Sequence, residues 1–164
     1  MKKSTRKILI VITGCFLLLW GCEEVLRRKI GGFAGSYPFV EHWEFNIPEN
    51  EMIELIKELK TEKSALQPPS ENELIGKRHS YWLYINFYYP ESKEIIHTWI
   101  RPSYDTTKTT FAFYSLTDED NKAEHRLINR DFWYVANKME INKFKKRILN
   151  LLKEKATHNK VYSK

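Results

Sequence analysis

Cysteine is scarce in this sequence of 164 residues, and both cysteines lie within the first 22 positions. Because no cysteine follows Cys22, the rest of the chain can form no disulfide framework and contains no cysteine nucleophile. Its stability must therefore come from the packing of an ordinary hydrophobic core. A chain of this length fits one globular domain and leaves little room for a second.

Beyond the N-terminus the sequence lacks a large excess of either basic or acidic residues. The formal net charge of +6 comes from 27 basic and 21 acidic residues. Four of the basic residues, Lys2, Lys3, Arg6 and Lys7, precede the first apolar run, and without them 23 basic residues face 21 acidic ones. This near balance argues against a nucleic-acid partner, and an aromatic content of 14% is typical of a folded domain.

Sequence motifs of catalysis and of metal binding are missing as well. The five histidines form no H-E-x-x-H or other close pair, no serine lies in a G-x-S-x-G turn, and neither glycine-rich phosphate-binding pattern occurs. The acidic run at residues 118–120 lacks the glycine and the later glutamate of an EF-hand loop. The sequence therefore predicts a protein that is not an enzyme and that holds no metal ion or cofactor.

The N-terminus contains one long apolar run. Residues 1–7 are basic, residues 8–20 are apolar apart from Thr13 and Gly14, and Glu23 and Glu24 end the run. A helix that spans a membrane needs about 20 apolar residues, so this shorter run better fits the apolar region of a secretory signal.

Each cysteine ends a short motif that resembles the lipobox of bacterial lipoprotein signal peptides. In that family an aliphatic residue, a small or branched residue and Gly or Ala precede the cysteine that is acylated and becomes the mature N-terminus. The sequence ITGC at residues 12–15 matches every position, whereas LWGC at residues 19–22 has Trp20 in the middle. Cleavage before Cys15 would leave an apolar region of only residues 8–13, followed by a mature chain that begins with apolar residues. We therefore favour Cys22 as the lipidation site, with Cys15 as the alternative.

The resemblance implies a division of the first 37 residues of the chain. Residues 1–21 would be a lipoprotein signal peptide, and residues 22–37 would carry the lipid, palmitate included, and serve as a flexible tether containing several glycines. Several acyl chains hold a protein durably to a membrane, which here would be that of the bacterial cell envelope. The outer membrane or cell surface is favoured over the inner membrane. An uncleaved anchor, and cleavage followed by release, are the alternatives.

Residues 38–156 predict a single α+β domain, followed by a polar C-terminal tail at residues 157–164. Alternating apolar and aromatic residues predict strands at residues 39–45, 81–88, 94–101, 109–116 and 124–129. Apolar residues at helical spacing predict helices from a capping box at Asn46 to about residue 63 and from a second box at Asn137 to about residue 155. The order β-α-β-β-β-β-α and its short connections predict two layers, with an antiparallel sheet that carries both helices on one face.

The opposite face of that sheet is the candidate binding surface. Leu83, Ile85 and Phe87 are predicted to point toward the helices, whereas the orientation of residues 94–101 is ambiguous. With Ile96 directed inward, the outward residues are Trp82, Tyr84, Tyr88, His97, Trp99, Arg101 and Tyr114. Trp, Tyr and Arg are enriched at binding hot spots. The same side chains can instead pack under residues 102–108 or 132–134, and the sequence leaves both interpretations open.

Three functional hypotheses follow. The first is a membrane-anchored lipoprotein whose small non-catalytic domain binds an unidentified protein or glycan in the cell envelope. The second is an immunity-type protein that neutralises a secreted toxin. The third is a hydrolase of envelope material that uses His97 and a nearby carboxylate as acid and base. A hydrolase requires a pocket in which these groups converge, whereas a binding module requires an accessible aromatic face.

Overall fold

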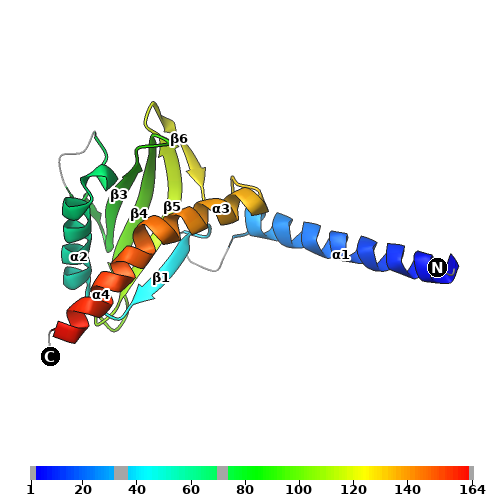
Figure 1. Cartoon of the computed structure of the whole chain (residues 1–164), viewed down its shortest axis with the longest axis horizontal. Coiled ribbons are helices and arrows are strands. Elements are labelled where there is room, and N and C mark those ends of the chain that lie inside the picture. Colours follow the sequence, from blue (N-terminus) through cyan, green and yellow to red (C-terminus); the bar gives the residue numbers. More distant parts are fainter. Residues whose placement is uncertain (1–2, 32–36, 70–73, 163–164) are drawn as a thin grey trace.

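The computed structural model describes residues 3–31, 37–69 and 74–162 and has the predicted α+β fold (Figure 1). Its elements, in chain order, are α1 (Lys3–Lys29), β1 (Glu41–Phe45), α2 (Glu49–Glu62), the 3-10 turn η1 (Ser64–Leu66), β2 (Arg78–His79), β3 (Trp82–Tyr89), β4 (Glu94–Pro102), β5 (Thr109–Asp118), β6 (Asn121–Leu127), α3 (Tyr134–Phe144), the π-helical turn η2 (Lys145–Leu149) and α4 (Asn150–Tyr162). The two-residue strand β2 was not predicted.

One antiparallel sheet organises the domain. Its strand order is β1-β5-β4-β3-β2, and β6 also pairs with β5. The long strand β5 has both β1 and β6 along the same edge, since β1 pairs with residues 109–113 and β6 with residues 115–118. β5 is therefore the strand on which the register of three neighbours depends.

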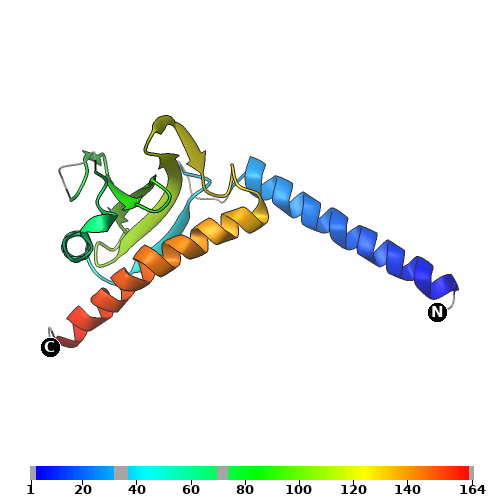
Figure 2. The same ribbon diagram turned by 45° about the horizontal axis from the view of Figure 1, so that its top comes forward.

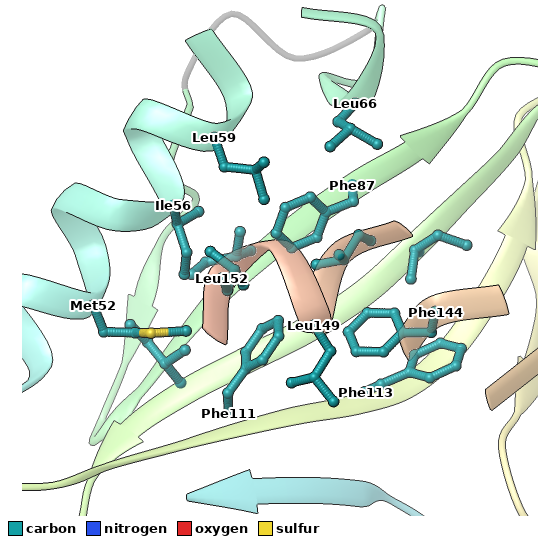
Figure 3. Packing of buried hydrophobic residues seen from close by; sticks show 14 of the residues in the cluster. Met52, Ile56, Leu59, Leu66, Phe87, Phe111, Phe113, Phe144, Leu149 and Leu152 are labelled. Atoms are coloured by element: carbon teal, nitrogen blue, oxygen red, sulfur yellow. The ribbon is translucent and has the colours of Figure 1, made fainter. Parts of the chain in front are cut away.

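Both helical segments lie against one face of this sheet, as predicted (Figure 2). Figure 3 shows side chains of α2 and of the C-terminal helix meeting above β3 and β5. The fully buried members of this core include Met52, Ile56, Leu59, Phe87, Phe111, Phe113, Phe144, Ile148 and Leu152. The alternation of the strands and the helical periodicity of residues 49–62 therefore build one common core.

The C-terminal helix differs from its prediction in both bounds and register. It begins at Tyr134, passes without a break through η2, and ends at Tyr162, so the predicted end near residue 155 is wrong. Residues 157–162 of the predicted polar tail belong to this helix. The π-helical turn adds a residue to one turn and shifts the helix face that follows. As a result Leu149 is buried, whereas Leu151, which was expected in the apolar stripe, is half-buried.

Neither predicted capping box forms. Pro48 occupies the N-cap position of α2 and no side chain caps that helix, while Glu49 pairs with Arg78 at 2.7 Å. Asn137 lies inside α3 with 2% of its surface exposed. Its side chain donates to Oδ1 of Asn129 at 2.6 Å and accepts the Asn129 backbone N–H at 2.8 Å. Because Asn129 has a left-handed backbone with φ 62°, Asn137 secures the turn between β6 and α3 instead of starting a helix.

The predicted flexible tether at residues 22–37 is wrong over its first part, because α1 continues to Lys29. Gly31 follows the helix with φ +70°, and a Cβ atom there would lie 2.3 Å from the carbonyl oxygen of Pro38. Only glycine fits this close approach. The other glycines of the predicted tether, Gly32 and Gly35, lie outside the described residues.

Helix α1 is long and apolar enough to cross a membrane over Lys7–Lys29, with a mean hydropathy of 2.0 in its most apolar window. Only 6% of that window is buried. A signal sequence near an N-terminus meets the same criteria, so α1 fits either a signal segment or a membrane anchor. The helix is longer than the apolar run, because Glu23 and Glu24 end the run but not the helix, which continues to Lys29.

We expect the substitution Phe144→Ala to lower the free energy of unfolding by about 3–5 kcal/mol. Phe144 is fully buried, with its ring stacked on Phe113 at 4.6 Å and on Trp43 at 5.4 Å between centroids. Urea unfolding of the full chain in detergent, followed by circular dichroism, measures the change. The exposed Lys146→Ala on the same helix is the control and should change stability by less than about 0.5 kcal/mol. Equal effects of the two substitutions would contradict this description of the core.

Candidate functional site

The seven predicted surface residues share the sheet face opposite the helices. Leu83, Ile85 and Phe87 belong to the core as predicted, and Ile96 and Ile100 are fully buried with them. The ambiguous strand therefore has its alternate residues on the outer face, where the structure brings together Trp82, Tyr84, Tyr88, His97, Trp99, Arg101 and Tyr114.

A β-bulge places Tyr114 on this face. His97 pairs with Ser115 and Thr98 pairs with Phe113, so Tyr114 lies between two paired positions. The extra residue lets Phe113 and Leu116 both reach the core although they are three positions apart. The ring of Tyr114 lies 5.9 Å from that of His97 and 6.3 Å from that of Tyr84.

Tyr37 covers the centre of the outer face. Its ring centroid lies 5.5 Å from that of Trp82, 5.6 Å from that of Trp99 and 5.7 Å from that of Tyr114. Its hydroxyl lies 2.5 Å from the hydroxyl of Tyr84. Burial, together with this hydrogen bond, raises the pKa of Tyr37 well above its usual range, and burial raises the pKa of Tyr114 to about 12. Tyr37 was not among the predicted surface residues, although an aromatic side chain at the end of a glycine-containing segment was a signal that could have found it.

The aromatic face is consequently a packed cluster with an accessible margin. Trp99 and Tyr88 are buried, with 4% and 7% of their surfaces exposed. Tyr81 is 60% exposed, contacts the half-buried Trp82 with 5.1 Å between ring centroids, and lies at the same end of the sheet as the exposed Arg101. We call Tyr81, Trp82 and Arg101 the aromatic margin.

Tyr88 is held at the other end of the same face. Its hydroxyl donates to Oε2 of Glu119 at 2.5 Å. This hydrogen bond to a carboxylate, aided by burial, raises the pKa of Tyr88 to about 12. The Tyr88 side chain therefore fastens the turn after β5 to the sheet.

His97 is a neutral, structural histidine in this arrangement. Its Nδ1 lies 2.8 Å from Oδ1 of Asn86, and its Nε2 lies 2.8 Å from Oγ1 of Thr117. Burial lowers the pKa of His97 to about 4, and the His125 ring, 4.8 Å away between centroids, contributes. The two ring nitrogens thus face an amide and a hydroxyl, and among the residues that the structure describes no carboxylate is hydrogen-bonded to either nitrogen.

The carboxylate of Glu94 lies on the face of β4 opposite to His97 and has three hydrogen-bond donors. Glu94 is 8% exposed and accepts hydrogen bonds from Ser92 at 2.6 Å, Arg126 at 2.8 Å and Lys143 at 2.9 Å. Burial by itself would raise its pKa, but these bonds hold the pKa of Glu94 below its usual range. The cluster joins β4, β6 and α3. Across residues 3–31, 37–69 and 74–162, no three His, Cys, Asp or Glu side chains are grouped so that they could hold a metal ion.

The end of α1 forms the second candidate site, because it is docked on the domain. Glu24 is 7% exposed and accepts two hydrogen bonds from Arg27, at 2.6 and 2.9 Å. Arg27 also donates to the carbonyl oxygen of Phe132 at 2.8 Å, and Arg28 donates to that of Arg130 at 2.8 Å. The predicted lipidation site Cys22 is exposed on the same helix, five residues before Arg27, and the alternative Cys15 is also an exposed free thiol.

Comparisons of the chain with protein-family models, curated proteins and solved structures find no match. The geometry of these two sites is therefore the basis for a functional proposal.

His97 should make the protein less stable in acid. Because its pKa is lowered from 6.5 to about 4 on folding, the unfolded chain binds the proton first, and stability is lost as the pH falls from about 6.5 toward 4. The loss from this one group should approach about 3 kcal/mol. His97→Gln should remove that part of the pH dependence, as measured by urea unfolding between pH 7 and 4. His79→Gln, at an exposed histidine, is the control, and identical pH slopes for wild type and His97→Gln would refute the assignment.

Proposed function

We propose that this protein is a lipoprotein of the bacterial cell envelope, acylated on Cys22, whose α+β domain is a non-catalytic binding module held against the membrane. The observation that supports this proposal best is the docking of the end of α1 through Arg27 and Arg28 onto backbone carbonyls of the domain. A chain fixed in this way keeps its domain within about two helical turns of the lipid, because Arg27 and Arg28 follow Cys22 by five and six residues.

The position of the docking residues favours Cys22 over Cys15. Cleavage before Cys22 retains Glu24, Arg27 and Arg28, so the contact with the domain survives maturation. Cleavage before Cys15 would instead leave seven further residues of exposed apolar helix, about 10 Å long, ahead of the domain. The earlier site therefore adds mostly exposed apolar surface, of which Trp20 contacts Tyr134 of the domain.

The aromatic sheet face supports a binding role rather than catalysis. The ring nitrogens of the buried His97 contact an amide and a hydroxyl, whereas the aromatic margin offers exposed Tyr, half-buried Trp and exposed Arg side chains on a packed base. Aromatic rings backed by a packed cluster lose little conformational entropy on binding. We infer that the partner is a protein or a glycan chain that contacts Tyr81, Trp82 and Arg101.

We expect mass spectrometry of the protein from its native membrane to show an N-terminus at Cys22 that carries acyl chains. Labelling of cells with a palmitate analogue should mark wild type and Cys15→Ser but leave Cys22→Ser unlabelled, because the cleaved and acylated thiol is then missing. An acylated Cys15 would move the site, and an intact Met1 without any acyl group would refute the lipoprotein proposal.

A photo-crosslinking residue such as benzoylphenylalanine at Tyr81 should yield a crosslinked adduct in intact cells. The matched control carries the same residue at Lys153, which is exposed on the C-terminal helix at the opposite layer of the domain. An adduct from position 81 and none from position 153 is the expected result. Equal adducts from both positions, or none from either, would refute the aromatic margin as a binding surface.

A further inference from the structure

The start of α3 has exposed apolar side chains where a surface helix normally has polar ones. Trp133, Val135 and Met139 are 67%, 66% and 65% exposed, and Tyr134 is 41% exposed. On the other side of the same helix, Ile141 and Phe144 are buried in the core. A helix that is apolar on two opposite sides has a second apolar environment to meet.

The position of these side chains next to α1 identifies that environment. In Figures 1 and 2, α1 projects away from the domain and its C-terminal end meets the start of α3. Trp20, inside the apolar run of α1, contacts Tyr134 edge to face with 6.3 Å between ring centroids. Tyr134 therefore lies at the depth at which the apolar segment ends.

Hydrogen bonds between the end of α1 and the domain fix the position of α1 relative to α3. Arg27 and Arg28 bind the carbonyl oxygens of Phe132 and Arg130, and the Arg28 guanidinium lies 4.6 Å from the centre of the Trp133 ring. An exposed Cys22 lies five residues before Arg27 on the same helix. The exposed side chains of α3 consequently reach the bilayer surface whether α1 spans the membrane or Cys22 carries the lipid.

Basic side chains surround the apolar ones. A hollow between α1 and the domain is lined by Arg28, Lys29, Phe39, Arg130 and Trp133, among others. Lys138 lies 5.7 Å from the centre of the Tyr134 ring. The nearby carboxylates Glu24 and Asp131 are paired with Arg27 and Arg130. Trp and Tyr among Lys and Arg are the side chains that favour the boundary between headgroups and acyl chains.

We propose that Trp133, Tyr134, Val135 and Met139 form a membrane-contact surface that enters the interface of the bilayer holding the anchor, where the neighbouring Arg28, Lys29, Arg130 and Lys138 meet lipid phosphates. This inference rests on the membrane anchoring in the proposed function. It requires neither the acylation of Cys22 nor the binding of a partner to the aromatic margin. The domain would then be seated on the bilayer in one orientation, with the aromatic margin held at a set distance from it.

Tryptophan quenching by lipids tests this surface in the full-length protein reconstituted into vesicles. Acyl chains brominated close to the headgroup quench only the indoles that reach the interface. Trp20 and Trp133 are the two of the five tryptophans that the proposal places there, so Trp133→Phe should remove about half of the quenching when Trp20 is retained and nearly all of it after cleavage before Cys22. Trp82→Phe, on the sheet face, is the matched control and should not reduce the quenched emission.

Two further variants distinguish the contribution of apolar contacts to membrane binding from that of basic side chains. Val135→Glu should lower the quenching that depends on Trp133 without altering the fold, because Val135 is exposed. Phosphatidylglycerol in the vesicles should increase this quenching in wild type but not in Lys29→Gln/Lys138→Gln, since the added charge then meets fewer basic groups.

The possible failures have different meanings. If the protein floats with the vesicles but Trp133→Phe is quenched as strongly as wild type, the surface lies off the membrane and is free for a protein partner, which overturns the inference and leaves the anchor intact. If quenching is unaffected by phosphatidylglycerol, the basic residues meet no headgroup and that part of the proposal is wrong. If the protein does not float at all, the anchoring itself has failed.

Discussion

The ring of Phe144, stacked between Phe113 of β5 and Trp43 of β1, is the contact on which the rest of the structure depends. It ties the C-terminal helix to β5 and to β1, the strand that pairs with the first half of β5. The π-helical turn begins at the next residue, so the helix can keep Phe144 in this stack and still bury Ile148, Leu149 and Leu152. The two ends of the helix then reach α2 on one side and the turn after β6 on the other.

The turn after β6 connects the core to the C-terminal end of α1. Asn137 holds the left-handed Asn129 in place, and the following carbonyls of Arg130 and Phe132 become acceptors for the last turn of α1. The direction of α1 relative to the domain is therefore fixed by contacts that originate in the core. The proposed membrane contact would account for the apolar side chains at the start of α3 that are exposed and lie outside the core.

The outer face of the sheet shows how far sequence patterns reach. Alternation on β3 separated Leu83 and Phe87 from Tyr84 correctly, because a strand necessarily sends neighbouring side chains to opposite faces. It could not show that Tyr37, 45 residues earlier than Trp82, lies on top of this face. Nor could it show that His97 contacts Asn86 and Thr117 instead of a carboxylate, since these contacts depend on strand register and on the bulge at Tyr114.

The sequence by itself determined the α+β class, the inward and outward residues of β3 and β5, the helical stripe of α2 and the presence of an apolar N-terminal segment, because each is a local pattern with a period set by backbone geometry. The orientation of β4 was decided only by the tertiary structure. Tertiary structure alone decided which caps form, where the C-terminal helix changes register, and that residues 22–29 are a docked helix rather than a tether. These features depend on side chains far apart in the chain, such as Arg27 and Phe132, whose pairing no local period encodes.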